Sequence, residues 1–254
     1  MPKSPFLVFR KMNNKLFITA AIAFGLAHTA VSMAAADNAS KANFATKVNT
    51  LVGTDYTGNT YPGAQTPFGM VQLSPDNGLP GWDRIAGYFY PDSTIAGFSH
   101  THLSGTGAGD LYDISFLPVT LPLNDAPAPL GIHSKFSHDD ETAHAGYYQV
   151  RLTDYDINVE LTATPRCGVQ RYTFPNKGRQ RMVILNLTKA MNWDATKDTK
   201  ITQIDKCTIE GYRFSDGWAR NQRVWFRTRF SQPIDNIQFE RTELKTEDGH
   251  VTGY

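Results

Sequence analysis

A pair of histidines at alternate positions offers the most obvious ligating groups in this sequence. His100 and His102 flank Thr101, and in an extended strand both imidazoles would point to one side. That arrangement suits a metal ion, but a catalytic zinc needs about three protein ligands. The candidates for a third ligand are His133, His138, His144, Asp110 and Asp113. Because no spacing selects one of them, two other interpretations stay open: the histidines brace a polar loop, or they hydrogen-bond sugar hydroxyls.

Tryptophan beside charged side chains is a second pattern. Trp82 is followed by Asp83 and Arg84 in a segment rich in glycine and proline, and Trp218 lies in a similar segment. An exposed tryptophan can stack on the apolar face of a sugar ring, while neighbouring polar groups bond its hydroxyls. The alternative is a tryptophan that fills the interior of its own loop.

The carboxylates do not single out a general acid and a general base. A glycosidase needs two opposed carboxyl groups, about 5–9.5 Å apart. The acids of 139–141 are consecutive, which is typical of a solvated turn. The glycines of 105–109 lack the spacing of a phosphate-binding loop. The sequence therefore assigns no catalytic residue and no metal ligand.

Composition and charge limit the classes of protein. The chain has 254 residues, 41% of them hydrophobic and 19% charged, which is typical of a globular domain. A net charge of +1 excludes the basic footprint expected for a nucleic-acid partner. Cys167 and Cys207 form no C-x-x-C pattern, and both a disulfide and two free thiols stay open.

The first 36 residues are typical of a secretory signal peptide. Four basic residues and no acid precede an apolar run over 16–27, and small residues fill 32–36. Cleavage is expected after Ala34 or Ala36. A membrane anchor is the alternative, but a spanning helix needs about 20 apolar residues and this run is shorter. We expect an exported protein, periplasmic or secreted, without a membrane span after cleavage.

The rest of the chain, 37–254, predicts strands. Segments 147–152, 169–174 and 223–230 alternate between apolar and polar residues, the period of a half-buried strand. Segment 182–187 is continuously apolar and fits a strand covered on both faces. Short apolar runs within 43–130 are separated by glycine, proline and small polar residues. The pattern predicts an all-β fold, an antiparallel two-sheet sandwich with long ordered loops.

These segments also resemble a known family, the N-terminal domain of glycoside hydrolase family 92. The resemblance runs from about 48 to 254 and is carried by segments 53–55, 60–64, 67–76, 87–90, 95–107, 146–148, 160–164 and 171–175. The most specific of these is the run Phe-Ser-His-Thr-His-Leu-Ser-Gly-Thr-Gly at 98–107.

The resemblance implies a fold and an activity. Members are similar to galactose mutarotase in this domain, a supersandwich, and a larger (α/α) barrel follows it. They are calcium-dependent exo-α-mannosidases that invert the anomeric configuration and trim mannose from glycans such as N-glycans. The barrel supplies the general acid, the general base and most groups around Ca²⁺. The barrel is not within these 254 residues, so the resemblance implies a chain that is inactive alone.

The resemblance also implies roles for residues of the sandwich. Seven residues are expected to form part of the sugar pocket: Trp82, Asp83, His100, His102, Gly53, Thr54 and Asp55. The tryptophan would stack on the sugar, the aspartate and histidines would hydrogen-bond near it or brace the loop, and the last three would let backbone approach the ligand. Two rival functions stay open: a stand-alone carbohydrate-binding module, and a metal hydrolase that uses His100 and His102. The glycosidic linkage also stays open.

Overall fold

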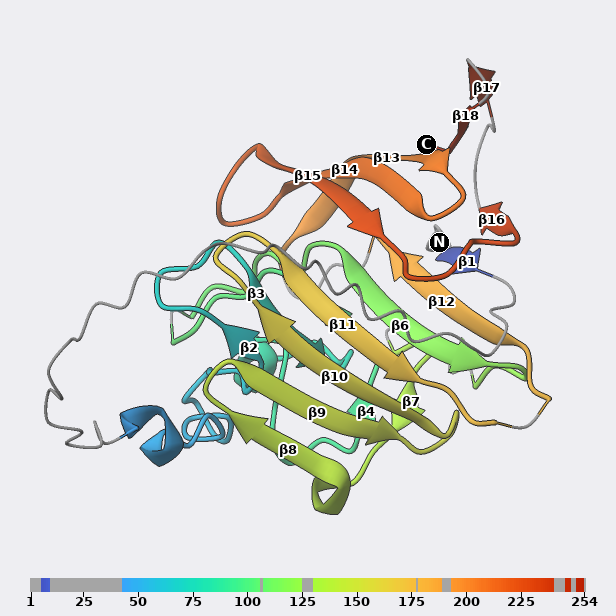
Figure 1. Ribbon diagram of the computed structural model, residues 1–254. Coiled ribbons are helices and arrows are strands. Elements are labelled where there is room, and N and C mark those ends of the chain that lie inside the picture. Colours follow the sequence, from blue (N-terminus) through green and yellow to red (C-terminus); the bar gives the residue numbers. More distant parts are fainter. Residues whose placement is uncertain are drawn as a thin grey trace, which may run out of the picture.

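The described residues form antiparallel sheets stacked in layers (Figure 1). The computed structural model describes residues 6–9, 43–105, 107–124, 130–176, 178–188, 193–239, 245–247 and 250–253. Besides strands, these residues form three short 3-10 helices, which are η1 (Phe44–Lys47), η2 (Trp82–Arg84) and η3 (His138–Asp140). None of the helices in these ranges is long and apolar enough to cross a membrane.

The central sheet has seven described strands in the order β16-β1-β12-β6-β5-β3-β2. They are β16 (Ile237–Phe239), β1 (Phe6–Phe9), β12 (Arg181–Asn186), β6 (Ser115–Thr120), β5 (Gly97–Ser99), β3 (Gln72–Asp76) and β2 (Ala64–Gln65). In β12, Met182 and Ile184 belong to one hydrophobic core, while Val183 and Leu185 belong to a second. The continuous apolar run therefore has the predicted cause, burial on both faces of the strand.

The second sheet covers one face of the central sheet. Its strands, in spatial order, are β11 (Gly168–Thr173), β10 (Ile157–Ala163), β9 (Tyr147–Leu152) and β8 (Glu141–His144). Tyr148, Val150 and Leu152 alternate along β9 and are fully buried against Leu73 and Leu117 of the central sheet. Side chains on one face of a strand repeat every second residue, so the alternation in the sequence gives this buried face.

A third sheet covers the other face of the central sheet. Its described strands, in spatial order, are β15 (Gln222–Arg229), β14 (Thr208–Asp216), β13 (Ala195–Asp205), β18 (His250–Gly253) and β17 (Lys245–Glu247). Ile201 and Ile209 form a core with Val183 and Leu185 of β12. A separate pair consists of β4 (Thr94–Ile95) and β7 (Ser134–Lys135).

The prediction of an all-β antiparallel sandwich is confirmed, and the sandwich has the third layer in addition. Most of the predicted signal peptide lies outside the described residues, so it stays a prediction. Its residues Phe6–Phe9 are described, and they pair as β1 between β12 and β16. Both cysteines are free thiols, Cys167 exposed and Cys207 partly buried.

Candidate functional site

Trp82 lies in η2 with its indole at the surface. The residue is 55% exposed, and its ring meets the ring of Trp193 edge-on with centroids 6.0 Å apart. Arg84 holds the loop in place through two hydrogen bonds of 2.6 Å from its guanidinium to the carboxylate of Asp92. The indole thus projects from a fixed loop, and the interpretation of Trp82 as a residue filling its own loop does not describe it. Asp83, next to it, is partly exposed.

The segment Gly53-Thr54-Asp55 forms a tight turn. Gly53 has φ +84°, and its carbonyl accepts a hydrogen bond from the amide of Thr60 at 3.2 Å. Thr54 is buried, with its hydroxyl donating to Leu51 O at 2.8 Å. Asp55 is exposed. The turn therefore leaves the carboxylate of Asp55 at the surface and commits the hydroxyl of Thr54 to the loop itself.

His100 points into the protein between the central sheet and β11. Its Nδ1–H donates to Ile114 O at 2.7 Å, and its Nε2 lies 3.4 Å from Nε2 of Gln170. The imidazole nearly touches β11, because a methyl group on Gly168 would lie 2.8 Å from Nε2 of His100. Desolvation lowers the pKa of His100 to about 4, against the opposing effect of the Ile114 hydrogen bond. The side chain is therefore neutral near pH 7.

His102 is buried at 3% exposure and supports β3. Its Nδ1–H donates to Gln72 O at 2.7 Å, and its Nε2 lies 2.9 Å from Oδ1 of Asp76 and 3.1 Å from Oγ of Ser99. Both ring nitrogens are thus engaged by the protein. Of the two roles expected for His102, the structure has the bracing role and not the hydrogen bond to a sugar.

Among the described residues, His100 and His102 each bond protein groups and belong to no cluster of metal-ligating side chains. No strand forms at 100–102, and the two imidazoles have different surroundings. The described ranges contain no group of three or more His, Cys, Asp or Glu that could hold a metal ion. Asp110 and Asp113, candidates for a third ligand, hold loops together instead.

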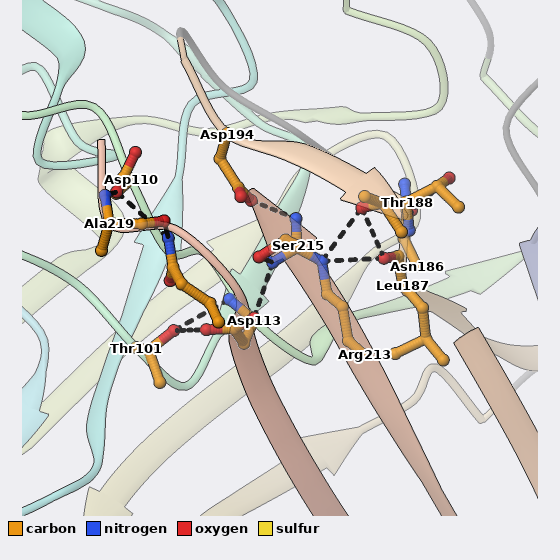
Figure 2. Close-up of polar contacts among 12 residues, drawn as sticks. Thr101, Asp110, Asp113, Asn186, Leu187, Thr188, Asp194, Arg213, Ser215 and Ala219 are labelled. Atoms are coloured by element: carbon orange, nitrogen blue, oxygen red, sulfur yellow. Dashed lines mark hydrogen bonds and ion pairs between the residues drawn. The ribbon is translucent and has the colours of Figure 1, made fainter. Parts of the chain in front are cut away.

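A buried ionic network was missed by sequence reasoning. Arg213 of β14 is 1% exposed, and its guanidinium lies at the centre of the contacts drawn in Figure 2. Nη1 donates to Oδ1 of Asp113 at 2.6 Å, Nη2 bonds the carboxylate of Asp194, and Nε donates to Leu187 O at 2.9 Å. The second oxygen of Asp113 accepts from the hydroxyl of Thr101 at 2.7 Å. Arg213 therefore ties Asp113, Leu187 and Asp194 to β14, and Asp113 ties Thr101 to them.

Two opposing effects act on Asp194. Burial raises the pKa of Asp194, while the charge of Arg213 and its hydrogen bond lower it. The result is a pKa above the ordinary value for aspartate. Since two carboxylates share one guanidinium, the buried cluster contains more acidic groups than basic groups.

Asp110 organises the neighbouring loop. It is 1% exposed, and its carboxylate accepts from the amides of Trp218 at 2.9 Å and Ala219 at 2.8 Å. Three of the next four residues have positive φ: Leu111, Tyr112 and Ile114. Such angles are unfavourable for residues with a side chain and concentrate where a loop must be held in one shape. No spacing signalled this, because the partners are about a hundred residues apart.

Comparison with known proteins identifies the class to which this fold and these loops belong, a glycoside hydrolase. The model of the glycosyl hydrolase family 92 N-terminal domain matches residues 47–254. The chain belongs to this family.

The similar structures are mannosidases and glycosyl hydrolases of the same family. The family GH92 α-mannosidase BT3965 from Bacteroides thetaiotaomicron is 34% identical with a TM-score of 0.74, over 83% of this chain and 30% of that one. The GH92 family glycosyl hydrolase ccman5 is 26% identical with a TM-score of 0.63, over 83% of this chain and 30% of that one.

A curated relative from Arthroderma benhamiae, an uncharacterized secreted glycosidase, is 28% identical over 156 residues. Those residues are 56% of this chain and 19% of the relative. The chain thus spans less than a third of each of these proteins.

Proposed function

We propose that this chain supplies sugar-binding loops to an exo-acting α-mannosidase that removes mannose from glycoprotein N-glycans. The observation that carries the proposal is Trp82, a half-exposed indole on a loop fixed by Arg84 and Asp92. A rigid exposed indole suits the apolar face of a pyranose ring. The α-mannosidase relative from Bacteroides supports mannose as the sugar.

The proton-transfer groups of this reaction lie elsewhere in the proposed enzyme. The buried aspartates among the described residues are Asp76, Asp110, Asp113 and Asp194, and each is bound to protein groups. Burial keeps these carboxylates away from a substrate at the surface, so they are not placed to protonate a leaving oxygen or to activate water. We therefore assign the general acid and base of an inverting hydrolysis to the (α/α) barrel, and we propose that this chain is inactive alone.

We assign no calcium site to the described residues. Ca²⁺ prefers about 6–8 oxygen ligands, and the described ranges bring together no group of three or more His, Cys, Asp or Glu that could hold a metal ion. We propose that the complete enzyme is calcium-dependent through ligands of the barrel, and no step here passes through the ion. The proposed role of this chain is to orient the sugar by stacking Trp82 on it.

The barrel is proposed to pack on the first loops of the sandwich. Large apolar side chains are exposed repeatedly within one stretch of the chain: Phe44, Val48, Val52, Tyr56, Phe68 and Met70. Such a concentration marks an interaction surface. The exposed residue Asp55 lies in the same stretch, which supports a sugar site at the edge of this contact.

Hydrolysis of an aryl α-mannoside tests whether this chain supplies sugar-binding loops and the barrel supplies the acid and base. We expect no turnover by this chain, with or without added Ca²⁺. A chimera in which the chain replaces the matching region of the Bacteroides α-mannosidase is expected to hydrolyse the substrate. In the chimera, Trp82→Ala should lower kcat/KM about tenfold, the loss of one stacking contact. Trp225→Ala, on the outer face of β15, is the control.

Two results would contradict the proposal. Turnover by the chain alone at the rate of the chimera would place the acid and base inside it. An unchanged kcat/KM in Trp82→Ala would make Trp82 a structural residue.

A carbohydrate-binding module is the second candidate function, and the exposed indole of Trp82 favours it equally. It predicts mannose binding by the chain and no turnover by the chimera. We also propose export, to the periplasm or outside the cell, because the curated relative is described as secreted.

A further inference from the structure

Three tryptophans meet one short loop, 107–110. A methyl group on Gly107 would lie 3.3 Å from the ring of Trp82. The amide of Trp193 donates to the carbonyl of Gly109 at 3.4 Å, and the amide of Trp218 donates to Asp110 at 2.9 Å. Residues 107, 109 and 110 of the loop thus contact the three tryptophans, Trp82 at its ring and the other two at their backbone amides, and the rings of Trp82 and Trp193 also contact each other.

All three indoles are exposed, although their backbones are held. Trp193 is 49% exposed and Trp218 is 76% exposed, beside Trp82 at 55%. Backbone hydrogen bonds hold Trp193 and Trp218, and the Arg84–Asp92 contact holds the turn of Trp82, which limits the conformational freedom lost on binding. The neighbour of Trp193 in sequence is Asp194, which is bonded to the buried Arg213.

The anchors of Trp218 lie in the network of Figure 2. The carboxylate of Asp110 accepts from the amides of Trp218 and Ala219, and also from Nε2 of Gln222 at 3.1 Å. A methyl group on Gly217 would overlap the same carboxylate. The turn therefore wraps tightly around Asp110 and fixes the backbone from which the exposed indole of Trp218 projects.

We infer that Trp82, Trp193 and Trp218 form one aromatic surface that binds successive rings of an oligosaccharide. This inference rests on the proposed function, in which Trp82 contacts mannose, and it assigns the rings beyond that mannose to Trp193 and Trp218. Each indole offers an apolar face to a pyranose ring and an N–H to a hydroxyl.

The chemistry of the surface favours a glycan over another occupant. The exposed apolar residues of 44–70 include no tryptophan, whereas this surface consists of tryptophans with charged sequence neighbours. Those neighbours include Asp83 and the exposed Arg220, which suit hydroxyl groups. A protein partner would bury these charges, while a sugar can hydrogen-bond them.

Calorimetric titration of the purified chain with mannose and with a panel of α-mannotrioses tests the inference. We expect at least one trisaccharide to bind more tightly than mannose. Trp193→Ala and Trp218→Ala should each weaken trisaccharide binding about threefold to tenfold, the effect of one lost aromatic contact, and weaken mannose binding less than trisaccharide binding. Because these side chains are exposed, the variants should keep the wild-type circular dichroism.

Trp225→Ala is the matched control. Trp225 is 62% exposed and packs edge-on against Phe214, with centroids 5.3 Å apart, on the outer face of the third sheet. It should bind trisaccharide as the wild type does. Equal affinity for mannose and every trisaccharide would overturn the inference and leave the proposed function standing. Unchanged trisaccharide binding in both variants, or no binding of any mannotriose, would also overturn it, whereas the proposed function depends on turnover by the chimera.

Discussion

Arg213 carries a permanent positive charge into the interior, where Asp113 and Asp194 surround it. Arg213 is 1% exposed, so the two carboxylates provide the hydrogen bonds and charge compensation that water would provide at the surface. Its contacts join β14 to the loops at 101, 113, 187 and 194. The ion pair of Arg213 with Asp194 therefore helps to hold the neighbouring Trp193 in place.

Arg213→Met should destabilise the chain strongly. The substitution keeps the volume of the stem but leaves two buried carboxylates without a cation. Breaking a buried pair in this way costs about 3–5 kcal/mol in the free energy of unfolding. Urea denaturation followed by circular dichroism measures the loss. Adding Asp113→Asn and Asp194→Asn should recover part of it, since both orphaned charges are then removed.

Arg227→Met is the control for this prediction. Arg227 donates to Glu210 at 2.6 Å, but its side chain is 67% exposed. A surface ion pair contributes below about 1 kcal/mol. A loss in Arg213→Met no larger than in Arg227→Met would show that the buried network does not stabilise the fold.

His100 makes the free energy of unfolding depend on pH. Its pKa falls from 6.5 to about 4 on folding, so the unfolded chain takes up the proton first. The contribution of the neutral His100 to the free energy of unfolding is fully present above pH 6.5 and is lost as the pH falls toward 4. It amounts to at most about 3 kcal/mol. His100→Asn should therefore lose less free energy of unfolding between pH 6.5 and 4 than the wild type loses.

The measurement is a series of urea titrations across that pH range. His144→Asn replaces an exposed histidine and should keep the slope of the wild type. Parallel curves for wild type and His100→Asn would mean that His100 is not desolvated in the folded state.

At the scale of elements, the sequence predicted the buried faces of strands whose own residues show a continuous apolar run or an apolar–polar alternation. The continuous run in β12 and the alternation in β9 and β15 predicted burial on both faces or on one. The link between Arg213 and Asp113 could not be predicted, because residues a hundred positions apart meet only after the sheets stack. His102 was placed on an extended strand, whereas the chain leaves β5 at Ser99 and turns the imidazole inward.

Gly211 makes the close approach of β13 and β14 possible. A methyl group there would lie 3.0 Å from the carbonyl carbon of Lys200, nearer still to its oxygen, and 3.1 Å from the ring of Phe226. Because the Lys200 backbone cannot move aside within the strand pair, Gly211→Ala should separate the strands. We expect a loss of about 1–3 kcal/mol in the free energy of unfolding, measured by urea denaturation.

Gly131→Ala separates crowding from backbone strain. Gly131 has φ +60°, and a methyl group there would meet nothing within 4 Å. That substitution should cost about 1 kcal/mol, from the left-handed conformation alone. A smaller loss of free energy of unfolding in Gly211→Ala than in Gly131→Ala would contradict the prediction that a methyl group crowds β13 and β14.

At the scale of the whole molecule, export is the property that the leader sequence predicts. Expression of the full chain in a Gram-negative host should give an exported product that begins at Ala35 or Asp37. N-terminal sequencing of the periplasmic and medium fractions measures this. Replacement of Ala34 and Ala36 by bulky residues should block processing, and an intact Met1 on the exported wild type would contradict the prediction.

Processing at that site would change the central sheet. In the described structure Leu7 pairs with Leu185 of β12 on one side and with Phe239 of β16 on the other. Removal of Phe6–Phe9 would leave the peptide groups of both neighbours without a partner, and such an edge is a template for another chain. Maturation would thus open a strand-wide slot, ready for strand donation by a later segment of a longer polypeptide or by a second copy.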